Sequence, residues 1–137
     1  MNLACLCGQV EIAVPHRPEF IHECNCTLCS KTGARWGYFD PAAVTVQGAT
    51  ASFARQDKSD PAVHVHFCQR CGATTHFRLT PSAVERFGDT MMGVNMWLAH
   101  PADLAGIELR FPDGQSWIGE GEFGFIRPAR IIGADRA

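Results

Sequence analysis

The sequence predicts an all-β domain built from short antiparallel strands with a few short helical turns. Apolar residues alternate with polar ones over several short stretches, which is the pattern of strands with one buried face. Gly, Pro and Asp interrupt the chain between these stretches, as they do at turns between strands. The 137 residues contain neither a repeat nor a long linker. We therefore expect residues 1–137 to form a single domain.

The individual strands follow from the alternation. Residues 9–14 place Val10, Ile12 and Val14 on one face, which predicts a half-buried strand. The same reasoning predicts further short strands at 43–46, 51–54, 63–67, 75–79 and 107–111.

Proline and glycine define the remaining elements. Residues 81–87 and 101–106 each begin with proline, which suits a first helical turn, so both are predicted as one or two turns of helix. The PDG sequence at 112–114 predicts a turn between two C-terminal strands. Residues 124–137 show no clear period and receive no assignment, and we expect the last of them to be mobile.

Charge and hydropathy exclude several classes of protein. Twelve basic and fourteen acidic residues give a net charge of −2, whereas a nucleic-acid-binding surface would need a basic stripe. No apolar run approaches the roughly 18 residues of a membrane span. The N-terminus has neither the basic nor the apolar region of a secretory signal. We therefore expect a cytoplasmic protein that binds neither nucleic acid nor membrane.

Seven cysteines fall into three groups: CLCG (5–8), CNCTLC (24–29) and FCQRCG (67–72). In a reducing compartment, close cysteine pairs indicate metal ligands more often than disulfides. The first and last groups each hold two cysteines and end in glycine, which lets the backbone fold around an ion. We pair these half-sites into one tetrahedral zinc site of Cys5, Cys7, Cys68 and Cys71, which staples the small domain.

The remaining cysteines are Cys24, Cys26 and Cys29. Three protein ligands with an open fourth position describe a catalytic or ligand-exchanging zinc. Sequence alone leaves two alternatives. One is a closed structural site in which a histidine is the fourth ligand, with His22, His64, His66 and His76 as candidates. The other is a trio of metal-free thiols.

These motifs resemble the glutathione-dependent formaldehyde-activating enzyme (GFA) family, also called the centromere protein V-like domain. The pattern is CxCG, then CxCxxCxK, then FCxxCG, and it includes all seven cysteines and Lys31. The resemblance is strongest over residues 3–111. It implies a β-tent fold, a zinc-stapled β-sandwich with two zinc ions. It also implies that Cys5, Cys7, Cys68 and Cys71 hold the structural zinc, and that Cys24, Cys26 and Cys29 hold a second, exchangeable zinc whose site can be partly occupied.

The activity that the resemblance implies is a carbon–sulfur lyase reaction, the condensation of formaldehyde with glutathione to S-hydroxymethylglutathione. Asn25 and Ser30 stand where the family commonly has histidine and arginine, and NMWLAHP (95–101) replaces the usual stretch after the last cysteines. Both departures lie where we expect the small-molecule pocket. Lys31 is predicted to bind a substrate carboxylate, to favour the local thiolates electrostatically, or to be a solvated surface residue.

We expect a zinc enzyme in which Cys24, Cys26, Cys29 and Lys31 act on a small thiol, or on its aldehyde adduct, such as that of glutathione. A fourth thiolate from the substrate can join three cysteines and zinc, which lowers the pKa of that thiol. The alternatives are a non-catalytic zinc-binding module that engages a protein partner and a metal or thiol buffer. An exposed strand edge would also allow a homodimer.

Overall fold

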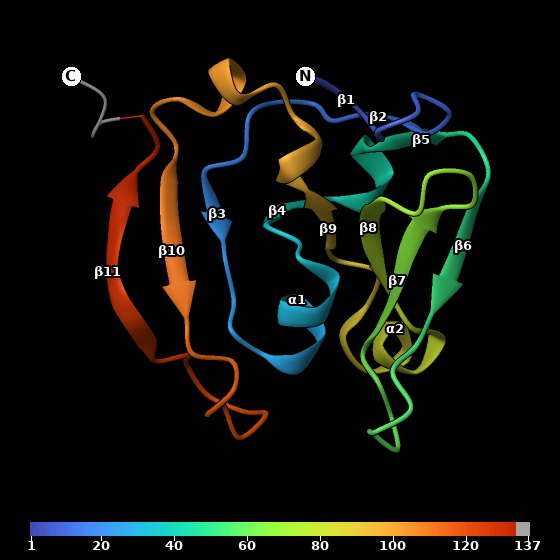
Figure 1. The fold of residues 1–137 in the computed structure, drawn as a ribbon. Helices are drawn as coiled ribbons and strands as arrows, with labels where there is room; N and C mark the ends of the chain where they lie inside the picture. Colours follow the sequence, from blue (N-terminus) through green and yellow to red (C-terminus); the bar gives the residue numbers. More distant parts are fainter. Residues whose placement is uncertain (134–137) are drawn as a thin grey trace.

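Two β-sheets and a few short helical segments make up residues 1–133, the part of the chain that this computed structural model describes (Figure 1). The smaller sheet contains β1 (Asn2–Ala4), β2 (Glu11–Ala13) and β5 (Thr45–Gln47). The larger sheet contains β3 (Phe20–His22), β4 (Trp36–Phe39), β6 (Thr50–Phe53), β7 (Val63–Cys68), β8 (Thr74–Leu79), β9 (Met92–Asn95), β10 (Glu108–Pro112) and β11 (Phe125–Ile131). The helices are α1 (Thr27–Thr32) and α2 (Pro81–Phe87), with 3₁₀ turns at Pro41–Ala43, Met96–Leu98 and Pro101–Leu104.

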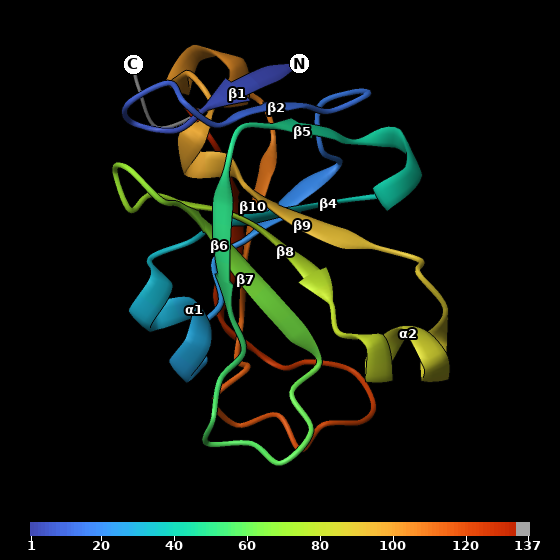
Figure 2. The ribbon, with the colours of Figure 1, turned by 90° about the vertical axis from the view of Figure 1, so that its right-hand side faces the viewer.

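The two sheets have simple strand orders, β1–β2–β5 and β11–β10–β3–β4–β9–β8–β7–β6. The smaller sheet lies across one end of the larger one, and α1 and α2 lie toward the opposite end (Figures 1 and 2). Paired strands run antiparallel except β3 and β10, which are parallel. The strands β3 and β4 meet at only one paired position, His22 with Trp36. The all-β prediction is therefore confirmed, with this one parallel pair as a difference.

Buried apolar side chains form two separate clusters. The larger one joins the two sheets, and its fully buried members include Ile12, Ile21, Met92 and Leu109. Cys5 and Cys68 belong to this cluster. The smaller cluster contains Cys29, Ala34, Trp36, Val65 and Phe77, with Cys24 and Cys26 packed against it. The two groups of predicted metal ligands therefore lie in different parts of the core.

The alternating segments were predicted well. Strands appear at β2, β6, β7, β8 and β10, and helical turns appear at α2 and at Pro101–Leu104, close to the predicted bounds. The strand predicted at 43–46 is displaced, because Asp40 caps a 3₁₀ turn at Pro41–Ala43 and β5 begins only at Thr45. The PDG turn does follow β10, but residues 113–124 all lie between β10 and β11.

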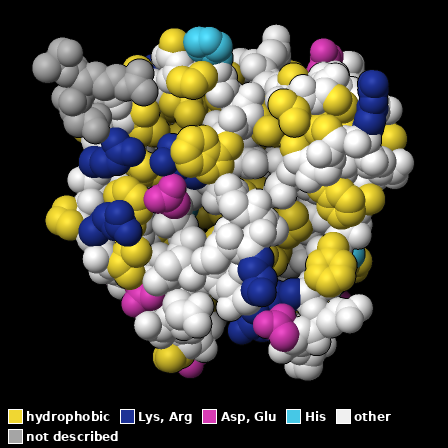
Figure 3. Space-filling view, in the orientation of Figure 1, with side chains coloured by type: hydrophobic (Ala, Val, Ile, Leu, Met, Phe, Trp, Pro, Cys, Tyr) yellow, Lys and Arg dark blue, Asp and Glu magenta, His cyan; other side chains and the backbone are white. Residues whose placement is uncertain are grey.

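Part of the unassigned tail forms β11, an antiparallel edge strand beside β10. All seven of its residues are exposed, so no buried face produces an alternating pattern. In the space-filling view, hydrophobic and basic side chains alternate along the left edge, where β11 lies (Figure 3). The expected mobility of the last residues concerns residues 134–137, which lie outside the described part. No helix within residues 1–133 is long and apolar enough to cross a membrane.

Candidate metal centres

The predicted four-cysteine site is assembled from two similar turns. Cys5 and Cys7 lie between β1 and β2, whereas Cys68 and Cys71 lie at the turn between β7 and β8. Each turn closes on a glycine in the left-handed region, Gly8 with φ 80° and Gly72 with φ 77°. The glycine N–H donates to the carbonyl of the cysteine three or four residues earlier, at 3.0 and 2.9 Å. A side chain at either glycine would strain this backbone conformation.

The four sulfurs fit a zinc ion. All four lie within 4.8 Å of one another, and the Sγ atoms of Cys5 and Cys7, like those of Cys7 and Cys68, are 3.7 Å apart. A tetrahedron with Zn–S bonds of about 2.3 Å has sulfur–sulfur edges of about 3.8 Å. Backbone N–H groups of Val10 and Arg70 donate to Cys5 and Cys68 Sγ at 3.3 and 3.4 Å, as thiolates require.

The three-cysteine cluster comes from one short segment that follows β3. Cys26 is the N-cap of α1, and its Sγ accepts from the N–H of Cys29 at 3.3 Å. Cys24 Sγ accepts from the N–H of Cys26 at 3.4 Å. The three sulfurs lie within 4.8 Å of one another. The local helix start therefore brings the trio together, with no contribution from a distant cysteine.

Trp36 adds a side-chain donor to this cluster. Its Nε1–H donates to Cys29 Sγ at 3.3 Å, and the indole is only 2% exposed. No motif in the sequence indicates this hydrogen bond. Soft donors with N–H groups directed at them are a fitting set for zinc.

The three thiols of the trio hydrogen-bond to one another. Hydrogen bonds from the thiols of Cys24 and Cys29 lower the pKa of Cys26 to about 2. Hydrogen bonds with Cys24 and Cys26 raise the pKa of the Cys29 thiol. The other two thiols therefore favour the thiolate form of Cys26. A metal ion would displace the protons that remain on the trio when it binds.

No histidine completes the trio within residues 1–133. His22 Nδ1 lies 2.9 Å from the Tyr38 hydroxyl, and His66 and His76 stack on each other with ring centroids 4.3 Å apart. His64 lies next to this pair, on the same face of β7. Neither these histidines nor any described carboxylate has a ligand atom within 4.8 Å of all three sulfurs. The described residues therefore offer three candidate ligands at this site and four at the other.

Tyr38 also lies within electrostatic reach of the trio. Burial raises the pKa of its phenol, and the nearby thiolates of Cys29, Cys24 and Cys26 add to the rise. The hydroxyl therefore keeps its proton at neutral pH and can act as a hydrogen-bond donor. Tyr38 lies on β4, two residues after Trp36.

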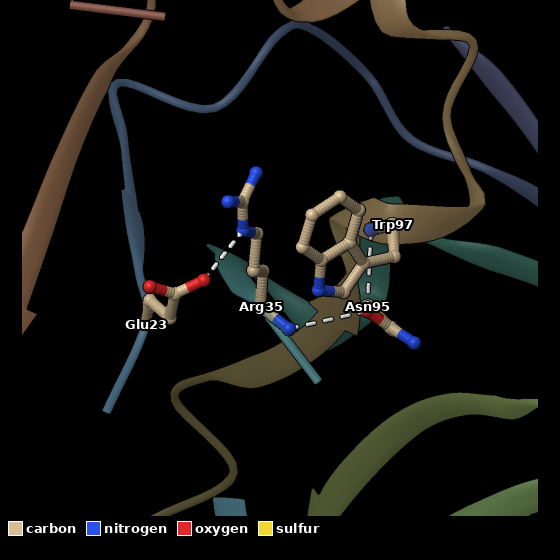
Figure 4. Close-up of polar contacts among 4 residues, drawn as sticks. All are labelled: Glu23, Arg35, Asn95 and Trp97. Atoms are coloured by element: carbon tan, nitrogen blue, oxygen red, sulfur yellow. Dashed lines mark hydrogen bonds and ion pairs between the residues drawn. The ribbon is translucent and has the colours of Figure 1, made fainter. Parts of the chain in front are cut away.

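A second polar arrangement includes Glu23, the residue before Cys24 (Figure 4). Arg35 Nε is 3.0 Å from Glu23 Oε1, and its guanidinium stacks over Trp97 at 3.6 Å from the ring centroid. Asn95 Oδ1 accepts from the backbone N–H groups of Arg35 and Trp97, both at 3.2 Å. Asn95 and Trp97 open the unusual stretch 95–101. This stretch therefore fixes the segment between α1 and β4, and the Arg35 charge is already paired.

Two other cations stand near the trio. Lys31, in the last turn of α1, is exposed and makes no hydrogen bond or ion pair with the described residues. Arg55 binds both oxygens of Asp57, and these hydrogen bonds raise the pKa of Arg55, with a smaller contribution from the thiolates of Cys26 and Cys29. The sequence suggested Lys31 but not Arg55, which lies in a loop without a motif.

Comparisons with known proteins bear on the fold and the family of the chain. A crystal structure of a Rhodobacter sphaeroides protein is similar in fold, with a TM-score of 0.58 and 24% identity over 78% of this chain and 97% of that one. No curated protein matches the chain. The family model described as "Glutathione-dependent formaldehyde-activating enzyme" matches residues 1–97, the part that holds all seven cysteines. The chain therefore belongs to the glutathione-dependent formaldehyde-activating enzyme family.

Proposed function

We propose that the protein is a zinc-dependent carbon–sulfur lyase-type enzyme that acts on the adduct of a small aldehyde with a thiol such as glutathione. The observation that carries this proposal is the three-cysteine cluster, to which no described residue adds a fourth ligand atom. The name of the family supports the thiol and the aldehyde. Residues 1–137 act as one domain, in a cytoplasm that keeps all seven thiols reduced.

The two clusters have different roles in this proposal. Cys5, Cys7, Cys68 and Cys71 hold a structural zinc, because four sulfurs already complete a tetrahedron. Cys24, Cys26 and Cys29 hold a second zinc that exchanges its fourth ligand. Its occupancy varies with the supply of metal and of thiol, because three ligands bind less tightly than four.

The reaction joins the thiol sulfur to the aldehyde carbon, and the proton of the thiol ends on the new hydroxyl. When bound at the trio, zinc supplies a position for the substrate thiolate and lowers the pKa of that thiol. Trp36 and the N–H of Cys29 fix the orientation of two of the three sulfurs. Tyr38 keeps its own proton, and its hydroxyl hydrogen-bonds with His22 Nδ1.

The alternative is a non-catalytic zinc module that binds a protein partner. The exposed apolar side chains of the C-terminal part favour this reading, among them Trp117, Phe125, Ile126 and Ile131. In that case the second metal would serve the fold alone and would not accept a thiol.

Native mass spectrometry separates the two proposals. The wild type and Cys26→Ser are compared with and without excess glutathione, and condensation of labelled formaldehyde with glutathione is followed by NMR. We expect two zinc ions and a retained glutathione in the wild type, one zinc and no glutathione in Cys26→Ser, and condensation only in the wild type. Two zinc ions without a thiol adduct would overturn the enzyme proposal and favour the binding module.

A further inference from the structure

The turn after β10 lies directly against the three-cysteine cluster. A Cβ added to Gly114 would stand 2.4 Å from Cys24 Sγ and 3.1 Å from Cys26 Cβ. Such distances leave no room for a side chain, so only glycine lets the backbone approach the sulfur this closely. The constraint is one of space, because the φ angle of Gly114 is not in the left-handed region.

Asn25 holds this turn in place with both ends of its amide. Its Nδ2 donates to Asp113 Oδ1 at 2.8 Å, and its Oδ1 accepts from the backbone N–H of Gln115 at 2.9 Å. Asn25 lies between Cys24 and Cys26, whereas its partners are 88 and 90 residues farther along the chain. A side chain that donates and accepts at once is needed here, and asparagine has that pair of groups.

The loop that continues from this turn is closed at its base and carries aromatic side chains. The N–H of Asp113 donates to the carbonyl of Gly124 at 2.7 Å, which joins the two ends of the loop. Trp117 and Phe123 pack together with ring centroids 4.7 Å apart, and Phe123 lies 6.4 Å from the ring of His22. The loop therefore places an aromatic pair next to the segment that leads into Cys24.

We propose that residues 113–124 form a fixed wall of the thiol site and that Asn25 is the positioning residue that holds this wall over Cys24. The wall lies outside residues 1–97, the part of the chain that matches the family model. Its glycine covers one side of the metal site, and its aromatic pair contacts the body of a bound thiol. The identity of the thiol rests on the proposed function, whereas the covering of the metal site does not.

The wall predicts a slow exchange of the second metal, which can be measured without any substrate. Zinc transfer to a coloured chelator is followed for the wild type, Gly114→Ala, Asn25→Ala and Asn25→Asp. We expect transfer from the three-cysteine site to be about tenfold faster in all three variants, the size of effect typical for residues that orient metal ligands. In Asn25→Asp the new carboxylate faces Asp113 and repels it.

A double substitution provides the rescue. In Asn25→Asp combined with Asp113→Asn, the new amide donates to the new carboxylate, which still accepts from the N–H of Gln115. The net charge is that of the wild type, and we expect the slow zinc transfer to return. Gln115→Ala is the matched control, because this residue contributes only its backbone N–H and its side chain is exposed. Thermal unfolding and the retained four-cysteine zinc check that each variant is folded.

Thiol binding to the cobalt-substituted proteins tests the second part of the proposal. Titrations with glutathione and with 2-mercaptoethanol are compared, because the smaller thiol reaches the metal but not the aromatic pair. We expect the wall variants to lose about tenfold in glutathione affinity and less than about twofold in 2-mercaptoethanol affinity. Equal losses of affinity for both thiols would overturn the wall proposal. A zinc-transfer rate that no variant changes would also overturn it. If the wild type binds neither thiol, the proposed function fails. The zinc-transfer rates alone then decide whether residues 113–124 cover the metal site.

Discussion

The two cysteine clusters differ in how the chain assembles them. The four-cysteine cluster joins turns that are 61 residues apart, and its buried sulfurs belong to the larger core cluster that links both sheets. The three-cysteine cluster comes from six consecutive residues and packs against the smaller cluster around Trp36. The four-cysteine cluster forms only when the chain is folded. The three-cysteine cluster is formed locally, at the start of one helix. This difference supports the proposed division of roles, in which the first cluster serves the fold and the second serves chemistry.

The strongest test of this difference compares Cys68→Ser with Cys26→Ser. The two cysteines are matched, because each is the first of a CxxC pair and accepts from the N–H three residues later. We expect Cys68→Ser to lose more than about 4 kcal/mol of unfolding free energy, as the loss of a structural metal does, and Cys26→Ser to lose about 2 kcal/mol or less. Chemical denaturation of the zinc-loaded proteins measures both. Equal losses would contradict the division of roles.

Removal of metal by a chelator should separate the clusters in time. We expect the zinc of the trio to leave first, with the far-ultraviolet circular dichroism unchanged, because a three-ligand site is incomplete. Loss of the zinc from the four-cysteine cluster should then coincide with unfolding, since a structural zinc contributes its binding free energy to the fold. Native mass spectra taken during the reaction give the order. Simultaneous loss of both ions would show that the clusters are coupled.

Trp36→Phe should affect the trio and leave the four-cysteine cluster intact. The substitution removes the only side-chain N–H that reaches a sulfur of the trio within residues 1–133. We expect about tenfold weaker zinc binding at this site. A cost of about 1–2 kcal/mol in stability should follow from the lost hydrogen bond and the smaller side chain.

Trp117→Phe is the matched control for that measurement. This indole also donates one hydrogen bond, to the carbonyl of Gly121, but its side chain is 40% exposed. Metal-competition titrations on both variants measure the affinity, and the visible spectra of the cobalt forms report the thiolate ligands. If Trp36→Phe leaves the affinity unchanged, the contact with Cys29 is packing alone.

The sequence allowed much of the four-cysteine cluster to be predicted and little of the surroundings of the trio. Glycine after each cysteine pair indicated the two turns, because glycine is the residue that adopts a positive φ angle without steric cost. No comparable sequence pattern indicated the wall formed by residues 113–124. Asn25 and Asp113 are ordinary turn residues, and only the fold shows that they meet across 88 positions. The strand β11 was missed for a related reason, since pairing with β10 creates it and no buried face marks it.

The smallest expected effect belongs to Lys31, which tests whether charge near the trio contributes to thiol binding. Its exposed ammonium can attract the carboxylates of glutathione, but solvent and salt weaken such an attraction. We expect Lys31→Ala to reduce glutathione affinity about threefold at low salt and hardly at all at 1 M salt, with stability changed by less than about 0.5 kcal/mol. Lys58→Ala, at the only other lysine of the chain, is the control. If glutathione affinity does not depend on Lys31 at any salt concentration, Lys31 is a solvated surface residue. The site would then recognise the thiol through its sulfur and through the aromatic pair of the wall alone.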